Sequence, residues 1–199
     1  MKTILRIDAS ARYKGSYSRQ LGDRLITKLK TKYPEITVIQ RDLAQGIPLI
    51  NEAMVVAYNT PDEERTLEQT EVLKPSRELV DELLSSDALI ITTPIYNFSV
   101  PASLKAYIDL VCRARLTFRY SSGGPVGLLR DRKTYLVMTS GGTPVGSDMD
   151  FATNYLKYVL DFMGIRDVEV IAGDRLMSGV EERLTQAYQA IEESVVALV

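Results

Sequence analysis

A short apolar run at residues 88–91 ends abruptly in a loop that two prolines bracket. A run without a polar face is typical of a central parallel strand that helices cover on both sides. Thr92 and Thr93 end the run, and Pro94 and Pro101 flank the loop that follows. Each proline fixes its own φ and disfavours a helical residue before it. The sequence therefore predicts a buried strand followed by a stiff loop.

The loop between the prolines carries the groups that a flat heteroaromatic ligand needs. Tyr96 and Phe98 offer aromatic faces, Asn97 can donate and accept hydrogen bonds, and the backbone N–H groups there lack a strand or helix partner. The candidate ligand-binding residues of this loop are Pro94, Ile95, Tyr96, Asn97 and Phe98. The alternative is a plain connection from strand to helix whose aromatic side chains only close the top of the core.

The rest of the chain alternates predicted strands with amphipathic helices. Strands are predicted at residues 3–9, 36–39, 88–93, 134–139 and 168–172, and helices at 18–33, 75–85, 101–114, 151–162 and 180–195. With 199 residues and 45% hydrophobic content, the chain suits one domain over residues 1–199. The alternation predicts an α/β fold, namely a flavodoxin-like doubly wound five-stranded parallel sheet of order 2-1-3-4-5 with helices on both faces.

Apolar residues at helical spacing predict which helix faces are buried. On the helix at 75–85 we expect Leu79, Val80, Leu83 and Leu84 to point inward. On the helix at 151–162 we expect most of a bulky stripe to be core, with the aromatic residues toward its end able to face a partner subunit. That stripe consists of Phe151, Tyr155, Tyr158, Val159 and Phe162.

Two segments depart from the regular alternation. Residues 42–74 hold prolines, a glycine and an acidic cluster, with one short helix expected at 51–58. A segment of this length is typical of a lid or of an arm that embraces a partner, although a solvated surface excursion fits equally. Residues 116–129 contain a Gly-Gly-Pro turn and are expected to form a small hairpin.

Two further loops should meet the loop at 94–101 at the carboxyl edge of the sheet, where ligands of open α/β sheets bind. The first, at the start of the first helix, offers Ser10, Ser16, Tyr17 and Ser18, whose hydroxyl and N–H groups suit a phosphate. An ordinary N-cap serine is the alternative. The second, at 139–142, ends in adjacent glycines that let a ligand approach the backbone, or that form a plain tight turn. Its candidate residues are Thr139, Ser140, Gly141 and Gly142.

Composition excludes several functions. The chain has no histidine and one cysteine, which excludes a Ser-His-Asp device, a His-ligated zinc and an internal disulfide, and we predict no metal site. A net charge of −2 gives no footprint for nucleic acid, and no apolar run reaches the roughly 20 residues that span a membrane. The chain start is typical of a strand rather than a signal peptide, so a cytoplasmic location is expected. The chemistry is therefore expected to belong to a bound cofactor.

Four segments together resemble a known family. Residues 10–18, 94–98, 117–120 and 140–142, in this order and spacing, resemble the FMN-dependent NADH azoreductases, also described as NADH:quinone oxidoreductases. The resemblance implies one FMN per subunit, a homodimer with sites at the subunit interface, and two-electron ping-pong hydride transfer from NADH or NADPH to a quinone or azo compound. It implies that the three loops bind FMN and that Asn59, Tyr120 and Phe162 line the substrate pocket. The competing function is a flavodoxin-like one-electron carrier, which the near-neutral charge disfavours.

Overall fold

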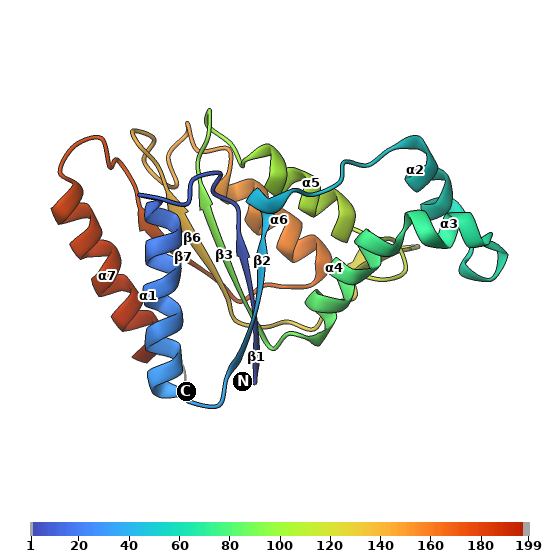
Figure 1. Ribbon diagram of the computed structural model, residues 1–199, viewed down its shortest axis with the longest axis horizontal. Coiled ribbons are helices and arrows are strands. Elements are labelled where there is room, and N and C mark those ends of the chain that lie inside the picture. The colour runs from blue at the N-terminus through green and yellow to red at the C-terminus, as the bar shows by residue number, and fades with distance from the viewer. Residues whose placement is uncertain (1, 197–199) are drawn as a thin grey trace.

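A five-stranded parallel sheet forms the centre of the molecule. The structure is a computed structural model that describes residues 2–196. The strands are β1 (Thr3–Asp8), β2 (Thr37–Asp42), β3 (Ala88–Pro94), β6 (Thr134–Thr139) and β7 (Val168–Gly173). Their order is β2-β1-β3-β6-β7 (Figure 1). Because β6 and β7 are the fourth and fifth strands of this sheet in chain order, the predicted order 2-1-3-4-5 is confirmed.

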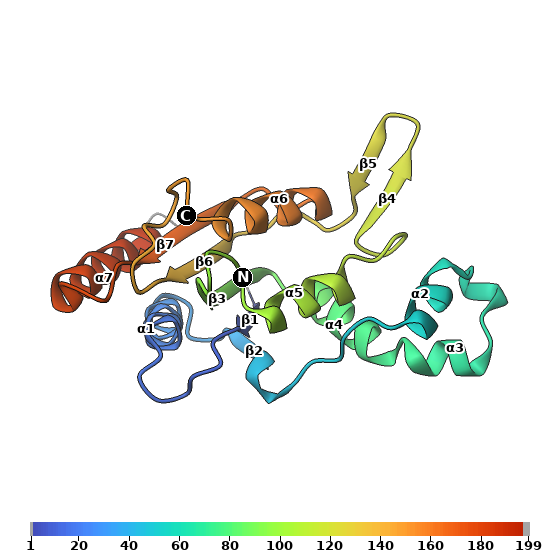
Figure 2. The same cartoon turned by 90° about the horizontal axis from the view of Figure 1, so that it is seen from above.

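Helices cover both faces of the sheet, and Figure 2 shows the two layers from above. One face packs against α1 (Tyr17–Lys32) and α7 (Val180–Val196), and the other against α4 (Lys74–Ser85), α5 (Ala102–Val111) and α6 (Thr153–Met163). Successive side chains of a strand point to opposite faces. Ile4 accordingly joins the core cluster under α1 and α7, whereas Leu5 and Ile7 join the cluster under α4, α5 and α6.

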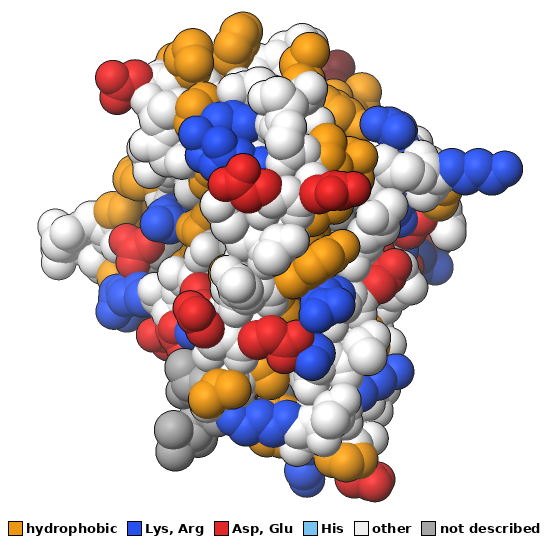
Figure 3. All heavy atoms as spheres, turned by 90° about the vertical axis from the view of Figure 1, so that its left-hand side faces the viewer, with side chains coloured by type: hydrophobic (Ala, Val, Ile, Leu, Met, Phe, Trp, Pro, Cys, Tyr) orange, Lys and Arg blue, Asp and Glu red, His pale blue; other side chains and the backbone are white. Residues whose placement is uncertain are grey.

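The outer surface of α1 and α7 mixes charges of both signs (Figure 3). Arg24 and Lys28 of α1 both pair with Glu192 of α7, at 3.1 and 2.8 Å. Exposed pairs of this kind contribute little to stability, about 0–1 kcal/mol. This face is therefore an ordinary solvated surface, held to the sheet by the apolar residues beneath it.

The irregular segment forms an arm that extends from the domain (Figures 1 and 2). It contains the short turns η1 (Leu43–Gln45) and η2 (Asp62–Glu64) and the helices α2 (Glu52–Asn59) and α3 (Leu67–Val72). We predicted one helix here and missed α3, which has no buried residue and hence no apolar stripe. Thr66 and Gln69 form a reciprocal capping box at its start, and their spacing was the available signal. The predicted hairpin is confirmed as β4 (Phe118–Ser121) and β5 (Gly124–Gly127).

Two predictions of buried helix faces were correct only in part. Leu79, Val80 and Leu83 of α4 are buried, and Tyr155, Val159 and Phe162 of α6 pack, partly buried, against the core. On α6 the buried side carries Leu156, Leu160 and Met163, whereas Phe151, just before the helix, and Tyr158 are 64% and 71% exposed. The bulky stripe and the buried stripe are offset by about one residue, and the sheet selects the more aliphatic one. Leu84 of α4 is likewise 45% exposed. Helix α5 also ends at Val111, three residues earlier than expected.

Candidate functional site

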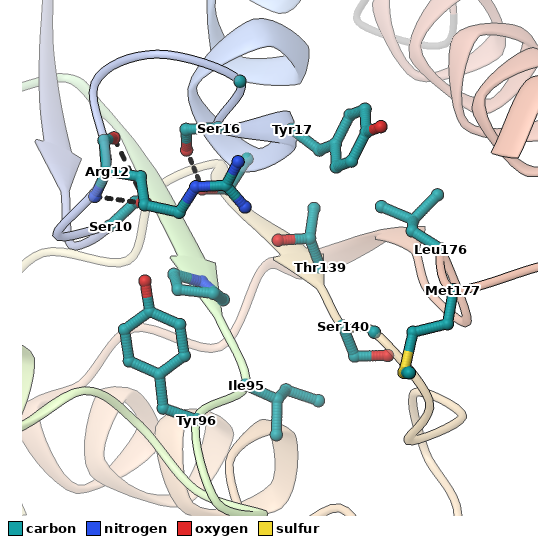
Figure 4. Close-up of a pocket in the computed structure, with 14 residues that line it drawn as sticks. Ser10, Arg12, Ser16, Tyr17, Ile95, Tyr96, Thr139, Ser140, Leu176 and Met177 are labelled. Atoms are coloured by element: carbon teal, nitrogen blue, oxygen red, sulfur yellow. Dashed lines mark hydrogen bonds between the residues drawn. The ribbon is translucent and has the colours of Figure 1, made fainter.

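A cavity of about 310 Å³ opens at the carboxyl ends of β1, β3 and β6 (Figure 4). This volume is at the lower end of the range for small-molecule sites, about 300–1,000 Å³. Three loops converge on it, as the sequence predicted. Its lining includes ten predicted residues, Ser10, Ser16, Tyr17, Ser18, Pro94, Ile95, Tyr96, Thr139, Ser140 and Gly141.

One end of the cavity is formed by the start of α1. Ser16 is the N-cap residue, but its side chain makes no capping hydrogen bond. Its Oγ instead lies 3.3 Å from Ser18 Oγ, and Ser10 Oγ accepts a hydrogen bond of 3.2 Å from the N–H of Arg12. The first N–H groups of a helix have no intrahelical partner, and the helix dipole favours negative charge there. This end therefore suits a phosphate group.

Arg12 and Gly15 also line this end, and the sequence analysis missed both. Gly15 has φ +65°, a left-handed conformation that glycine adopts without strain, and a Cβ there would meet Arg12 Nη2 at 3.0 Å. Arg12 adds a positive charge beside the serine hydroxyls (Figure 4). A basic residue within a loop rich in hydroxyl groups was the available signal.

A buried arginine lies behind the same loop and holds its backbone. Arg19 is 9% exposed, and its guanidinium donates to Ser10 O at 2.8 Å and to Arg12 O at 3.0 Å. The same group forms a forked pair with Asp42, at 2.6 and 3.2 Å. Burial alone would raise the pKa of Asp42, but the hydrogen bonds from Arg19 and from the N–H of Ala44 outweigh it and hold that pKa below its usual range. Arg19 is thus fixed by an acid on β2 and positions the loop at 10–12.

Asp8, at the end of β1, links the three neighbouring strands below the cavity. Its carboxylate is fully buried and accepts hydrogen bonds from Thr92 Oγ1 at 2.6 Å, Gln40 Nε2 at 2.7 Å and Arg6 Nε at 3.0 Å. A buried carboxylate is tolerated only when paired and hydrogen-bonded in this way. The polar residues that interrupt the first apolar strand are therefore part of a network that ties β1, β2 and β3 together beneath the site.

The opposite wall is apolar and ends in a tight turn. The N–H of Ile95 donates to Thr139 O at 2.7 Å, which joins the loops after β3 and β6. Tyr96 and Ser99 exchange backbone hydrogen bonds of 2.9 and 3.1 Å around a two-residue turn. Within that turn Asn97 and Phe98 have φ of +48° and +70°, which is strained for residues other than glycine. Strain of this kind is concentrated at functional sites. Neither residue lines the cavity in the single chain.

The loop after β6 is tied to a loop that the sequence analysis did not consider. Ser140 O accepts from the N–H of Leu176 at 3.0 Å, and Gly141 O accepts from the N–H of Met177 at 2.9 Å. These bonds bring Leu176 and Met177 into the cavity wall. The hydroxyl of Ser140 is used inside this pair of loops, where it accepts from the N–H of Arg175 at 3.1 Å.

The two glycines of this loop differ. A Cβ at Gly141 would approach Met177 Cγ to 3.1 Å, so the close packing of Met177 by itself favours glycine at this position. Gly142 does not line the cavity, and a Cβ there would meet only Met177 Sδ, at 4.0 Å. Both N–H groups lack a hydrogen-bond partner within residues 2–196. They are therefore available to a ligand.

The residues predicted to bind substrate lie outside the cavity in the single chain. Tyr120 on β4 is 74% exposed and packs edge-on against Phe118, with ring centroids 5.5 Å apart. The ring centroids of Phe118 and Phe162 are 4.5 Å apart, and Phe162, on α6, is half-buried. Asn59 ends α2, and its amide donates back to Val55 O at 2.9 Å. Their role in a substrate site across two subunits stays a prediction.

The fold and the cavity at the switch point of the sheet define a flavodoxin-like protein, and the chain belongs to that family. A family model described as "Flavodoxin-like fold" matches residues 2–195. Within this class the chain belongs with the FMN-dependent NADH:quinone oxidoreductases. It is 52% identical over 174 residues to such a protein of Thiobacillus denitrificans, covering 87% of this chain and 85% of the relative. It is 47% identical over 188 residues to one of Hahella chejuensis, covering 94% and 92%.

Solved structures give the same result. The FMN-dependent NADH-azoreductase of Bacillus anthracis in complex with FMN superimposes with a TM-score of 0.88 at 27% sequence identity, covering 99% of each chain. A second azoreductase structure, also of Bacillus anthracis, has a TM-score of 0.89 at 24% identity, which supports the fold alone. The resemblance inferred from four short sequence segments is therefore confirmed over the whole chain.

Proposed function

We propose that this protein binds FMN in the cavity at the carboxyl edge of the sheet and uses NADH or NADPH to reduce quinones and azo compounds. The observation that carries the proposal is the pairing, in one cavity, of an uncapped helix N-terminus rich in hydroxyl groups with an apolar wall. A ligand with a phosphate at one end and a flat ring at the other matches both. The relatives named above are FMN-dependent NADH:quinone oxidoreductases, and one neighbour is a complex with FMN.

Different loops would bind different parts of the cofactor. Ser10, Ser16, Tyr17 and Ser18 would hold the phosphate with the first-turn N–H groups of α1. The loop at 94–98 would lie against one side of the ring, and the loop at 139–142 would meet its far edge. Two features of this chain support the fit. The serines at the start of α1 are buried but leave the helix without a side-chain cap, and the N–H groups of Gly141 and Gly142 have no hydrogen-bond partner in the described chain.

When bound, FMN supplies the two-electron redox chemistry between a nicotinamide donor and a quinone or azo acceptor. The protein's own contribution is binding and orientation. The N–H groups of Gly141 and Gly142 would provide fixed donors for negative charge on the cofactor. Ile95 and Leu176, which are both buried, would exclude water from the apolar side of the cavity. No side chain is required to become covalently attached or to act as a nucleophile.

We further propose that the active unit is a cytoplasmic homodimer. One subunit leaves its cavity open, and exposed apolar residues on and beside α6 and the hairpin offer a surface for pairing. These include Tyr120, Val126, Phe151 and Tyr158. A two-fold partner would bring Tyr120, Phe162 and Asn59 of one subunit near the cavity of the other, and twofold pairing is the commonest oligomeric state. Within residues 2–196, no helix is long and apolar enough to cross a membrane.

The proposal is tested by reconstitution and kinetics. The protein freed of flavin should bind one FMN per chain in a fluorescence titration, and failure to bind would reject the proposal. With NADH and a benzoquinone, parallel double-reciprocal lines would support the two-step reaction. A stable one-electron state without NADH oxidation would instead favour the carrier function. Light scattering at the assay concentration tests whether the protein is a dimer. A monomer with full activity would exclude the dimer as the active unit.

A further inference from the structure

A second cavity, of about 340 Å³, lies where the arm joins the α/β domain. It shares no lining residue with the cavity at the carboxyl edge of the sheet. Four cationic side chains line it, Arg65, Lys74, Arg77 and Arg113, against one carboxylate, Asp62. They come from the arm, from the start of α4 and from the segment just after α5.

Three of these cations have acidic partners. Arg65 pairs with Asp62 at 2.8 Å, and Lys74 pairs with the nearby Glu71 at 2.7 Å. Arg77 pairs with Asp81, one helical turn further along α4, at 2.9 Å. Arg113 has no carboxylate within salt-bridge distance among residues 2–196, although it is only 4% exposed. The excess positive charge of the cavity is therefore that of Arg113.

Arg113 also makes few hydrogen bonds to uncharged acceptors. Its Nη1 donates to Ser76 Oγ at 2.7 Å, and the guanidinium carbon lies 4.0 Å from the centre of the Tyr58 ring. A guanidinium has five N–H donors. Its Nε and Nη2 make no hydrogen bond to the described part of the chain. Burial, together with the charges of Arg65 and Arg77, lowers the pKa of Arg113.

Arg132 shows how this chain satisfies a buried arginine that serves structure alone. It is 6% exposed and, like Arg113, has no acidic partner among the described residues. Its Nη1 donates to Leu83 O and Ser86 O, each at 2.5 Å, and its Nε donates to Arg130 O at 2.9 Å. These acceptors include carbonyl groups at the end of α4, where cations are favourable. Arg113 lacks such acceptors and instead lines a cavity.

We propose that this second cavity binds a small oxyanion, a phosphate or carboxylate group, with Arg113 as its principal ligand. The guanidinium of Arg113 has a single hydrogen-bond acceptor in the described chain and keeps other donors open to a ligand, and carboxylate and phosphate oxygens match its fork in a bidentate way. Lys74 and Arg77 complete the positive surround. A bound oxyanion would tie the arm to α5.

The test is calorimetric titration of the FMN-saturated protein with inorganic phosphate and, separately, with malonate, at constant ionic strength. We expect one anion per chain, and the tighter of the two probes identifies the source of the oxyanion. Arg113→Lys, which keeps the charge but loses the fork, should weaken binding at least tenfold. Lys74→Gln with Arg77→Gln, at exposed positions that leave folding intact, should weaken it severalfold. Arg130→Gln removes an exposed arginine outside the cavity and should leave the affinity unchanged.

Two outcomes would overturn the proposal. The first is that neither anion binds the native protein, and the second is that all variants bind equally. If neither anion binds and Arg113→Lys also converts a dimer to a monomer, a carboxylate of a second copy is the partner of Arg113 instead. Should Arg113→Lys fail to fold, the double variant at the two exposed positions decides. The inference does not rest on the redox function, because dependence on these residues identifies the second cavity whether or not FMN binds.

Discussion

Replacing Arg19 by lysine tests whether the loop at the start of α1 must be held in place for FMN to bind. The guanidinium makes two hydrogen bonds to the carbonyl groups of Ser10 and Arg12 and two to Asp42. Lysine can keep the ion pair with Asp42 but cannot reach both carbonyl groups in the same geometry. Since a hydrogen bond from a charged group contributes about 1.5–3 kcal/mol, we expect Arg19→Lys to lower the free energy of unfolding by about 2–4 kcal/mol.

The same change should weaken FMN binding. If binding must re-form the loop at a cost of about 1.4–2.8 kcal/mol, the affinity falls about 10- to 100-fold. Arg19→Ala should be worse for stability, by about 3–5 kcal/mol, because it leaves the carboxylate of Asp42 without its partner. Arg24→Lys, on the same helix but with a half-exposed side chain, is the matched control and should change stability by less than about 1 kcal/mol.

The assays are denaturant unfolding, a fluorescence titration with FMN, and hydrogen exchange of residues 10–16. Faster exchange in that loop should accompany the loss of affinity. The reasoning is refuted if Arg19→Lys loses stability but binds FMN as the native protein does, because loop position would then not govern binding. Unchanged stability would equally refute the energetic argument from the four hydrogen bonds.

Three further predictions follow from burial and charge. Tyr120→Ala should cost no more than about 1–2 kcal/mol of stability, since the ring is 74% exposed and packs edge-on against Phe118, while the KM for a quinone rises; a larger stability loss would indicate a structural role. Burial raises the pKa of Cys112 to about 11, so a thiol reagent at pH 8 should label the native protein far more slowly than the unfolded chain, and equal rates would contradict this. The N–H groups of Lys2 and Thr3 lower the pKa of Asp87 to about 2. Its contribution to stability is therefore present above about pH 4 and lost as the pH falls toward 2, and Asp87→Asn should remove that part of the acid dependence in unfolding curves.

The elements and their order could be predicted because they depend on local patterns. β6 has the predicted bounds, since its apolar run is closed by a turn on the carboxyl side. Once the chain alternates strands and helices, right-handed crossovers leave few topologies open. They also bring the loops after β1, β3 and β6 to one edge. The convergence of residues 10–18, 94–96 and 139–141 on one cavity therefore follows from the sequence pattern.

Contacts between distant segments were decided by the tertiary structure. Arg19 looks like any charged residue of an amphipathic helix, and its function depends on Asp42, 23 residues later and on another strand. Leu176 and Met177 enter the site because their N–H groups pair with the loop after β6. Arg113 lines its cavity without an acidic partner because Asp62, Glu71 and Asp81 pair with other cations. Local patterns in the sequence do not show which distant partner a charged side chain finds.

The buried face of α6 shows the same limit within one helix. Both Tyr155 with Tyr158 and Leu156 with Leu160 lie at helical spacing, so periodicity predicts an amphipathic helix without fixing its rotation about its axis. The sheet beneath selects the leucine side, because close packing favours aliphatic side chains that fit between the strands, and leaves Tyr158 largely exposed. The sequence by itself determined that a helix forms here and where it lies in the fold. Packing against the rest of the molecule decided which side chains remain on the surface, and with them the face open to a partner.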